Sequence, residues 1–272
     1  MTEGFRIIAH RGASAHAPEN TLTAFDAAVQ LGATEVELDV RLSADDCVVV
    51  FHDDRLDGKT RVTGRVKNYD ATFLRRVDLA PWFVRTHPDE APPVGDTCIP
   101  LLEEVFERLG SRVHYHVELK GWDDLLPLLV MRTVDAFGLR ECVTLTSFSM
   151  RPLVEVRKLD PDVPITFLLR DAADALRSAE FRPELERRSL AEVHDYWIAA
   201  AADAGFQHVG VRAADLQTET VERARASGLA IRGWGVATEE DLLKLMRLRA
   251  IGATVDWPGR ARSLLAASQG EV

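Results

Sequence analysis

Apolar and polar positions alternate in some stretches of the chain and follow a helical spacing in others. From Glu35 to Leu42 the sequence "EVELDVRL" alternates strictly, which is the pattern of a strand with one buried face. From Leu22 to Val29 the apolar residues instead recur at helical spacing, up to a stop at Gly32. Either Asn20 or Thr21 is suited to cap this helix. The start of the chain therefore predicts a helix followed by a strand.

The same two patterns recur along the rest of the chain. The stretches expected to form parallel strands are Phe5 to His10, Glu35 to Leu42, Val113 to Lys120, Val143 to Phe148, Ile165 to Leu169, His208 to Val211, Ile231 to Val236 and Ala253 to Asp256. The helices expected between them are Leu22 to Val29, Leu101 to Leu109, Leu125 to Phe137, Pro152 to Leu159, a long segment within Asp171 to Gly205, Thr218 to Ala226 and Glu239 to Leu248.

Strands that alternate with helices in this way predict an α/β protein, a (β/α)8 or TIM barrel, formed as a single domain by residues 1–272. Its active site is then expected at the carboxyl ends of the strands. The alternative architecture is an open doubly wound sheet. That sheet would need a Gly-x-Gly-x-x-Gly nucleotide motif, which follows none of the expected strands.

One further strand is expected outside the barrel, at Val48 to His52 ("VVVFH"). It follows a polar turn, so it predicts a hairpin with the preceding strand. If the turn centres near Ala44 and Asp45, His52 pairs opposite Glu37. A single hairpin would then bring an imidazole beside a pair of carboxylates.

Residues Asp54 to Cys98 break the alternation with turn-rich stretches such as "LDGKTRVTGR" and "PDEAPPVGD". We expect them to form a small insertion over the carboxyl-terminal face of the barrel, where such a segment shapes substrate choice. Trp82 in this insertion and Trp122 after it are candidates for the rim of the pocket.

Composition narrows the class of function. The chain has 272 residues and a formal net charge of -10, which disfavours a nucleic-acid partner. Its three cysteines contain no Cys-x-x-Cys pair, so they indicate neither a disulfide framework nor a zinc ribbon. The first strand begins too close to Met1 to leave room for a signal peptide, and no apolar run reaches membrane-spanning length. We expect a cytoplasmic enzyme with a small-molecule substrate and no stable membrane insertion.

Carboxylates gather on the inward faces of two strands. Glu37 and Asp39 share one face of their strand, and "VHYHVELK" places Glu118 on one face together with His114, His116 and Lys120. Three converging carboxylates raise one another's pKa unless a cation is present. Oxygen-only ligation suits Mg²⁺ or Ca²⁺ better than zinc, so one such divalent cation is the expected cofactor. The alternative is that the three carboxylates form ordinary surface ion pairs.

Several motifs, in order, resemble the glycerophosphodiester phosphodiesterase family. They are "HRG", "PENTLTAF", "ELDV", "FHD", "IPLLEEV", "VELK", "LTSF", "GWGV" and "VDWP", which together span nearly the whole chain. The resemblance implies that Glu37, Asp39 and Glu118 bind a divalent metal and that Arg11 and Lys120 hold the phosphate. Three carboxylates, one divalent ion and these two cations sum to one positive charge, which balances a phosphodiester.

Two histidines follow expected strands and suit proton transfer near neutral pH. His10 and His52 are the candidate catalytic residues, although a lone histidine is as a rule a hydrogen-bonded structural residue. The resemblance implies that the glycerol hydroxyl next to the phosphate attacks phosphorus while the two histidines act as base and acid. A cyclic phosphate would then be opened by water. The sequence does not assign the two roles.

Three further residues are candidates for substrate binding. Glu19 of "PEN" is expected to support the site from behind, or else to pack at the helix start. Trp234 is expected to lie against the glycerol carbons and Phe148 to wall the pocket, unless both are core residues.

The chain departs from the family pattern near the pocket. "WGVA" stands where the family has "WTVN", which puts recognition of the alcohol in doubt. His116 replaces an asparagine and is either an added ligand of the metal site or a spectator. Val255 replaces a threonine in the closing motif.

Together these observations favour a metal-dependent glycerophosphodiester phosphodiesterase that releases glycerol 3-phosphate and an alcohol. The alternatives are a lysophospholipase D, which an apolar groove under the insertion would favour, and a non-catalytic binder of phosphodiester head groups. The sequence leaves open which alcohol is released, whether Mg²⁺ or Ca²⁺ is used, and whether the protein is a monomer or a homodimer.

Overall fold

A computed structural model describes residues 4–91, 93–121, 123–179, 185 and 187–269 of the chain. Among these residues a ring of parallel strands closes because β1 pairs with both β9 and β2. The strands of the ring are β1 (Arg6–Ala9), β2 (Glu35–Leu42), β4 (His114–Leu119), β5 (Val143–Ser147), β6 (Ile165–Leu168), β7 (His208–Arg212), β8 (Ala230–Trp234) and β9 (Gly252–Val255). The predicted TIM barrel is therefore confirmed.

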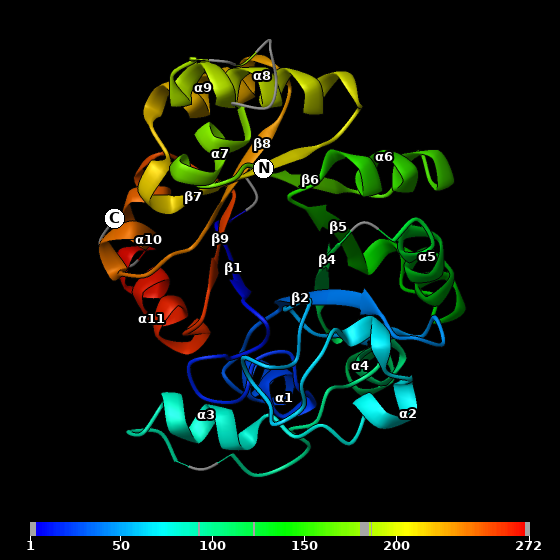
Figure 1. Cartoon of the computed structure of the whole chain (residues 1–272). Helices are drawn as coiled ribbons and strands as arrows, with labels where there is room; N and C mark the ends of the chain where they lie inside the picture. Colours follow the sequence, from blue (N-terminus) through cyan, green and yellow to red (C-terminus); the bar gives the residue numbers. More distant parts are fainter. Residues whose placement is uncertain (1–3, 92, 122, 180–184, 186, 270–272) are drawn as a thin grey trace.

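Helices surround the ring on its outside (Figure 1). They are α1 (Leu22–Gln30), α4 (Leu102–Leu109), α5 (Leu126–Ala136), α6 (Met150–Leu159), α7 (Ala172–Ala179), α8 (Leu190–Asp203), α9 (Thr218–Ala226), α10 (Glu239–Arg247) and α11 (Pro258–Gln269). The long segment predicted as helical contains both α7 and α8. Helix α11 was not predicted, because its apolar residues do not mark out one face. None of the helices in the described residues has the length and apolar character needed to cross a membrane.

Successive side chains along each strand point alternately to the outside and to the inside of the barrel. On β2, Val36 and Leu38 are fully buried in the core shared with the helices. Glu37 and Asp39 lie between them in sequence and therefore point into the barrel. Burying apolar side chains on the outer face stabilises the ring by about 25 cal/mol per Å². The same alternation leaves the inner face to polar residues, so the barrel positions charged groups at its centre.

The predicted hairpin forms, but its register differs from the prediction by one residue. In β3 (Val48–Val50), Val50 pairs with Val40 and Val49 with Arg41, so Glu37 has no partner in β3 and His52 lies beyond the strand. The turn holds one residue more than expected, because Asp46 takes a left-handed conformation with φ of 58°. The Ser43 N–H still donates to the Cys47 carbonyl at 3.0 Å.

The insertion packs as a small unit against the barrel. It contains α2 (Ala71–Leu74) and α3 (Ala80–Thr86), and its buried residues form an apolar cluster of their own with β3. Leu56 and Leu79 are fully buried in this cluster. The cluster fixes the loop after β3 against the sheet, and that loop carries residues of the site described next.

Candidate active site

Three carboxylates converge inside the barrel at the carboxyl ends of β2 and β4. One oxygen from each of Glu37, Asp39 and Glu118 lies within 4.8 Å of the others. All three side chains are buried, with Asp39 completely so. Parallel pairing of β2 with β4 sets Asp39 beside Glu118. The arrangement offers oxygen ligands that suit a hard divalent cation.

Two cations face the carboxylates. The Nε atom of Arg11 lies 3.0 Å from Oδ2 of Asp39. The ammonium of Lys120 lies 2.6 Å from Oε1 of Glu118 and 3.2 Å from Oδ1 of Asp39. Arg11 follows β1, while Lys120 follows β4. The ends of two strands thus place positive charge beside the carboxylates, where an anionic substrate would be held.

The carboxylates differ in their protonation. Burial and the neighbouring Asp39 carboxylate raise the pKa of Glu37 to about 7. Burial also acts to raise the pKa of Asp39, but Lys120 and Arg11 hold it well below its usual range. The amide of Asn20 donates to Asp39 Oδ2 at 2.8 Å and supports the charged form. Asp39 is therefore a permanent anion.

His10 forms a pair with an aspartate that follows β9. Its Nδ1 lies 2.6 Å from Oδ1 of Asp256, which also accepts a hydrogen bond from the Ser14 hydroxyl at 2.8 Å. Burial and Arg11 act to lower the pKa of His10, but the hydrogen bond to Asp256 and the negative charges of Glu37 and Asp256 together outweigh them, and the pKa is raised. The aspartate therefore orients the ring and favours its protonated form.

His52 forms a second pair of the same kind. Its Nδ1 lies 2.6 Å from Oδ1 of Asp53, and the ammonium of Lys59 lies 2.9 Å from Oδ2 of that carboxylate. Burial acts to raise the pKa of Asp53, but the hydrogen bonds from His52 and Lys59 lower it below its usual range. The guanidinium of Arg41 donates to the His52 carbonyl and holds the backbone. Both histidines thus leave Nε2 free of this pairing.

The loop after β1 adopts a strained backbone conformation that places Arg11 and Asn20 beside the carboxylates. Arg11 and Asn20 have positive φ values of 53° and 59°. Gly12 between them has a φ of 84°, and a Cβ there would lie 2.5 Å from the backbone of Ala24. Only glycine fits so close to α1. The loop turns back so tightly that the Arg11 N–H donates to Glu37 at 3.1 Å.

A pocket with a volume of about 280 Å³ contains these groups. His10, His52, Glu37, Glu118, Lys120 and Arg11 line it together with Phe148 and Trp234. The Phe148 and Trp234 rings meet edge to face at 5.1 Å. Arg232, also in the lining, is buried and donates to the Thr254 hydroxyl at 2.7 Å. The pocket thus joins cationic, imidazole, carboxylate and aromatic side chains.

Glu19 does not line the pocket but contacts two cations beside it. It accepts a hydrogen bond from Arg11 at 2.9 Å and lies 2.8 Å from the ammonium of Lys59. Of the two residues predicted as possible caps of α1, Thr21 is the observed cap, and its hydroxyl oxygen accepts from the Ala24 N–H at 3.2 Å. Asn20 instead bonds Asp39. The residues just after Pro18 thus both start α1 and contribute side chains to the site.

Other candidates lie apart from the carboxylates. His116 points toward the amino-terminal end of the barrel, where its Nε2 lies 2.7 Å from Glu35, so it is not grouped with the three carboxylates. Trp82 lies in the insertion with Lys59 over its ring at 5.5 Å. Trp122 lies outside the described residues.

Sequence reasoning missed four residues that the structure brings to the site. They are Asn20, Asp53, Lys59 and Asp256. Asp256 ends an expected strand, and this position at a strand end is the sequence feature that could have identified it as a site residue. Asp53 adjoins His52, but nothing in the sequence indicates that the two side chains pair. Lys59 lies in an aperiodic loop and carries no signal at all.

The chain is similar to known proteins over most of its length. The profile of the "Glycerophosphoryl diester phosphodiesterase family" matches residues 10–260. A Bacillus subtilis (strain 168) protein named glycerophosphodiester phosphodiesterase is 28% identical over 262 residues, which are 92% of this chain and 83% of the relative. The human protein named lysophospholipase D GDPD1 is 32% identical over 168 residues, or 60% of this chain and 51% of the relative.

A solved structure is similar in fold. It is an Oleispira antarctica phosphodiesterase in complex with the product sn-glycerol-3-phosphate, with a TM-score of 0.78, 22% identity and 96% coverage of both chains. At this identity the likeness shows the barrel fold alone.

Proposed function

Since the chain belongs to the glycerophosphoryl diester phosphodiesterase family, we propose that it hydrolyses glycerophosphodiesters to glycerol 3-phosphate and an alcohol with a divalent metal and two histidines. The observation that carries the proposal is one pocket lined by His10, His52, Glu37 and Glu118, with Asp39 buried beside the two glutamates. Each histidine is bonded to its own aspartate. Two oriented imidazoles beside a cation site suit the transfer of one proton to a phosphodiester and one from it.

The carboxylates fit a divalent cation by their chemistry and their surroundings. Glu37, Asp39 and Glu118 offer oxygen donors only, as Mg²⁺ and Ca²⁺ prefer. The Oδ1 atom of Asp39 is buried and accepts no well-directed hydrogen bond from the described residues. A buried acceptor of this kind is costly unless something binds it. When bound, the cation would acidify an attacking hydroxyl and offset charge on the phosphate.

Arg11 and Lys120 are the residues proposed to hold the phosphate. Arg11 presents a planar fork that suits two phosphate oxygens, and Lys120 adds a point charge. Both already contact Asp39, so their side chains are ordered before substrate binds. Summed with the carboxylates and a divalent ion, they leave one positive charge for the monoanionic diester.

His10 and His52 are proposed to move the protons. Because Nδ1 of each ring bonds an aspartate, Nε2 is the atom that takes or gives a proton. One histidine would remove the proton of the attacking hydroxyl, and the other would protonate the departing alcohol. Trp234 and Phe148 would pack against the glycerol carbons, and Glu19 would hold Arg11 in position.

A lysophospholipase D activity is the second candidate, and the similarity to the human lysophospholipase D favours it. It would use the same carboxylates and histidines on a substrate that carries an acyl chain. A non-catalytic binder is disfavoured, because all seven expected residues are present and all of them except the buried Asp39 line one pocket.

Replacing Glu37 tests the metal assignment. Glu37→Gln keeps the shape of the side chain but removes a charged oxygen donor, so we expect turnover to fall at least about 100-fold and cation binding in calorimetry to weaken. A thermal unfolding transition like that of the parent protein would show that the fold is intact. Near-native turnover in a folded variant would refute the assignment.

A further inference from the structure

One charged side chain of the active-site pocket has no part in the function proposed above. Arg232 lies on β8 two residues before Trp234, so strand alternation points both side chains into the barrel. Arg232 is only 2% exposed, yet it lines the active-site pocket and also a small cavity at the opposite end of the barrel. Its side chain therefore lies at the inner end of the active-site pocket, between the two cavities.

One hydrogen bond positions the guanidinium of this arginine. Nη1 of Arg232 donates to the Thr254 hydroxyl at 2.7 Å, and Thr254 lines the same pocket. The Nε atom of Arg232 is buried and has no hydrogen-bond acceptor among the described residues. A buried donor of this kind is costly unless something binds it or offsets its charge. Arg232 thus has binding capacity that the described part of the chain does not use.

The carboxylates of the active site act on Arg232 more strongly than the one at the opposite end. Burial lowers the pKa of the guanidinium, and Glu37, Glu118 and then Glu35 oppose that shift. Arginine stays charged nonetheless. Glu35, at the opposite end, has another cation beside it, since Nε of Arg6 lies 3.8 Å from its carboxylate. The positive charge of Arg232 therefore acts mainly on the active site.

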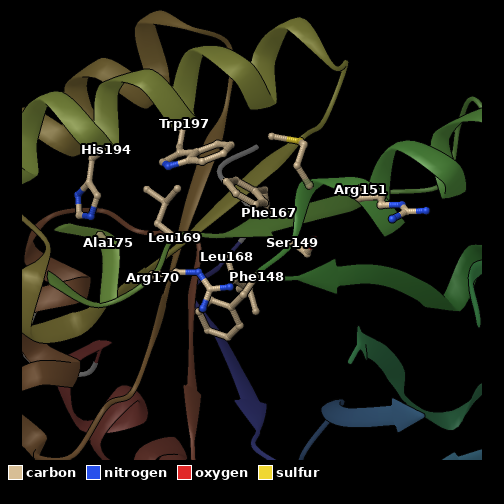
Figure 2. A pocket seen from close by; sticks show the side chains of 11 residues that line it. Phe148, Ser149, Arg151, Phe167, Leu168, Leu169, Arg170, Ala175, His194 and Trp197 are labelled. Atoms are coloured by element: carbon tan, nitrogen blue, oxygen red, sulfur yellow. The ribbon is translucent and has the colours of Figure 1, made fainter. Parts of the chain in front are cut away.

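Two nearby arginines do not share this position. Figure 2 shows Arg151 and Arg170, which follow β5 and β6 in the chain, but both are exposed and line another cavity. Phe148 and Leu168, also labelled there, line the active-site pocket and give it an apolar side. Charges beside such a wall are screened less than charges in water, so Arg232 interacts more strongly with a bound phosphate than an exposed arginine does.

Arg232 changes the charge balance of the site. Arg11, Lys120 and Arg232 cancel the three carboxylates, so a bound divalent ion leaves two positive charges instead of one. A phosphodiester carries one negative charge, and it carries two once a deprotonated oxygen has added to phosphorus. A phosphate monoester is also mostly a dianion at pH 7. The site therefore matches the charge of the transition state and of the product better than that of the substrate.

We propose that Arg232 is the third cation of the phosphate site and adapts it to a doubly charged phosphate. The inference rests on the proposed function and names a further residue for that reaction. The attacking hydroxyl gives its proton to one histidine and bonds to phosphorus, the bond from phosphorus to the departing alcohol breaks, and the other histidine protonates that alcohol. An interaction that is stronger in the transition state than in the substrate complex accelerates this step.

Two ligands of similar shape and different charge test the inference on the parent protein. Glycerol 3-phosphate is a dianion at pH 8, whereas glycerol methylphosphonate is a monoanion that the proposed reaction cannot cleave. With the activating cation present, we expect calorimetry to show that glycerol 3-phosphate binds at least about tenfold more tightly. Equal affinities would overturn the inference.

Arg232→Met removes the charge and nearly preserves the length of the side chain. Because a Coulomb energy is proportional to each charge, the fold-loss for a dianion should be about the square of that for a monoanion. We expect about tenfold weaker binding of the methylphosphonate, about 100-fold weaker binding of glycerol 3-phosphate and at least about tenfold lower kcat. The divalent cation should instead bind more tightly, because Arg232 repels it.

Two further variants serve as controls. Arg6→Met is matched to Arg232→Met, because Arg6 lines the same small cavity but not the active-site pocket. It should leave kcat and both ligand affinities within about threefold of the parent values. Arg232→Lys retains the charge and should retain the preference for the dianion, so its loss in folded protein would overturn the inference. This variant and the parent comparison keep the test valid if Arg232→Met does not fold.

The outcomes separate this inference from the function it rests on. Hydrolysis of glycerophosphodiesters with unchanged kcat in Arg232→Met, or with equal losses for the two ligands, would overturn the third cation and leave the proposed function standing. Weaker binding of the divalent cation together with both ligands would also overturn it, because the role would then be structural. No hydrolysis of any glycerophosphodiester by the folded parent protein would overturn the proposed function and the inference together.

Discussion

At the level of single residues, the two histidines of the site share one feature: one ring nitrogen of each is already hydrogen-bonded to an aspartate. His10 follows β1 and His52 follows β3, yet each bonds an aspartate through Nδ1 at 2.6 Å. A neutral imidazole that donates from Nδ1 carries its lone pair on Nε2, so the aspartates select the tautomer that can act as a base. The two aspartates therefore matter to proton transfer without touching substrate.

Asp256→Asn tests this arrangement. Because the hydrogen bond to Asp256 raises the pKa of His10, the amide should lower that pKa and move the His10 limb of the kcat/KM pH profile to lower pH. This direction holds whether His10 is the acid or the base. We also expect kcat to fall at least about tenfold, because the amide no longer fixes the tautomer. Ser14→Ala, which removes the other hydrogen bond to Asp256, is the control and should shift the profile less. An unchanged profile in Asp256→Asn would contradict the role.

Residue types and strand alternation were enough to predict much of the site. Glu37, Asp39 and Glu118 could be predicted because alternation fixes which face a side chain takes. The partners of the histidines could not be predicted in the same way. Asp256 lies 246 residues from His10 in sequence, and only closure of the barrel brings β9 beside β1. A pairing of that kind depends on tertiary structure and not on local pattern.

At the scale of elements, the insertion is a part of the site. Its Lys59 lies 2.8 Å from Glu19 and 2.9 Å from Asp53, and these carboxylates hold Arg11 and His52 respectively. One lysine thus connects the residue proposed to bind phosphate with a residue proposed to move a proton. The side chain is only 12% exposed, so its ion pairs are weakly screened.

Lys59→Met tests the link between the insertion and the site. Loss of the ammonium leaves Glu19 and Asp53 without their shared cation, so Arg11 and His52 should be held less firmly and kcat/KM should fall about tenfold or more. Lys67→Met is a matched control, because Lys67 belongs to the same insertion and pairs with Asp46 and Asp123 on the surface. Equal effects of the two substitutions in steady-state kinetics would argue against a specific role for Lys59.

Element boundaries were predicted well where periodicity was strong. The strand Glu35–Leu42 was predicted with its observed bounds, since its alternation is strict. The predicted hairpin register was wrong by one residue, because Asp46 adopts a left-handed conformation that enlarges the turn. An aspartate in the sequence does not by itself indicate that conformation. Lys59 had no predicted role for a similar reason, since an aperiodic loop gives no direction for its side chains.

At the scale of the whole molecule, the barrel separates two polar regions. The carboxyl-terminal end holds the proposed catalytic groups. The opposite end holds a cluster in which the half-buried Arg6, Glu35 and His208 line a small cavity together with the buried Arg232. Apart from Arg232, these residues do not line the active-site pocket, so we expect them to bear on stability.

The histidines of that cluster make stability depend on pH. Burial and the positive charges of Arg6, Arg232 and His114 lower the pKa of His208 from 6.5 to about 4, while Glu35 opposes the shift. The unfolded chain therefore binds more protons than the folded one between these values. From this residue alone, the free energy of unfolding should fall as pH drops through that window, by up to about 1.4 kcal/mol per pH unit.

Denaturant unfolding at several pH values tests this expectation. His208→Gln should show a shallower loss of stability below pH 6.5 than the parent protein. His16→Gln, at an exposed histidine, is the control and should keep the parent slope. Equal slopes for the parent and His208→Gln would show that this histidine does not contribute.

The central claim is that a metal-dependent phosphodiesterase site lies at the carboxyl-terminal end of this barrel. The most direct measurement is release of glycerol 3-phosphate from glycerophosphocholine, glycerophosphoethanolamine, glycerophosphoinositol and glycerophosphoglycerol with added Mg²⁺, added Ca²⁺ or EDTA. We expect release from at least one diester, which EDTA abolishes and which either Mg²⁺ or Ca²⁺ restores. Release that persists in EDTA would contradict the metal site, and no release from folded protein under any condition would contradict the assigned reaction.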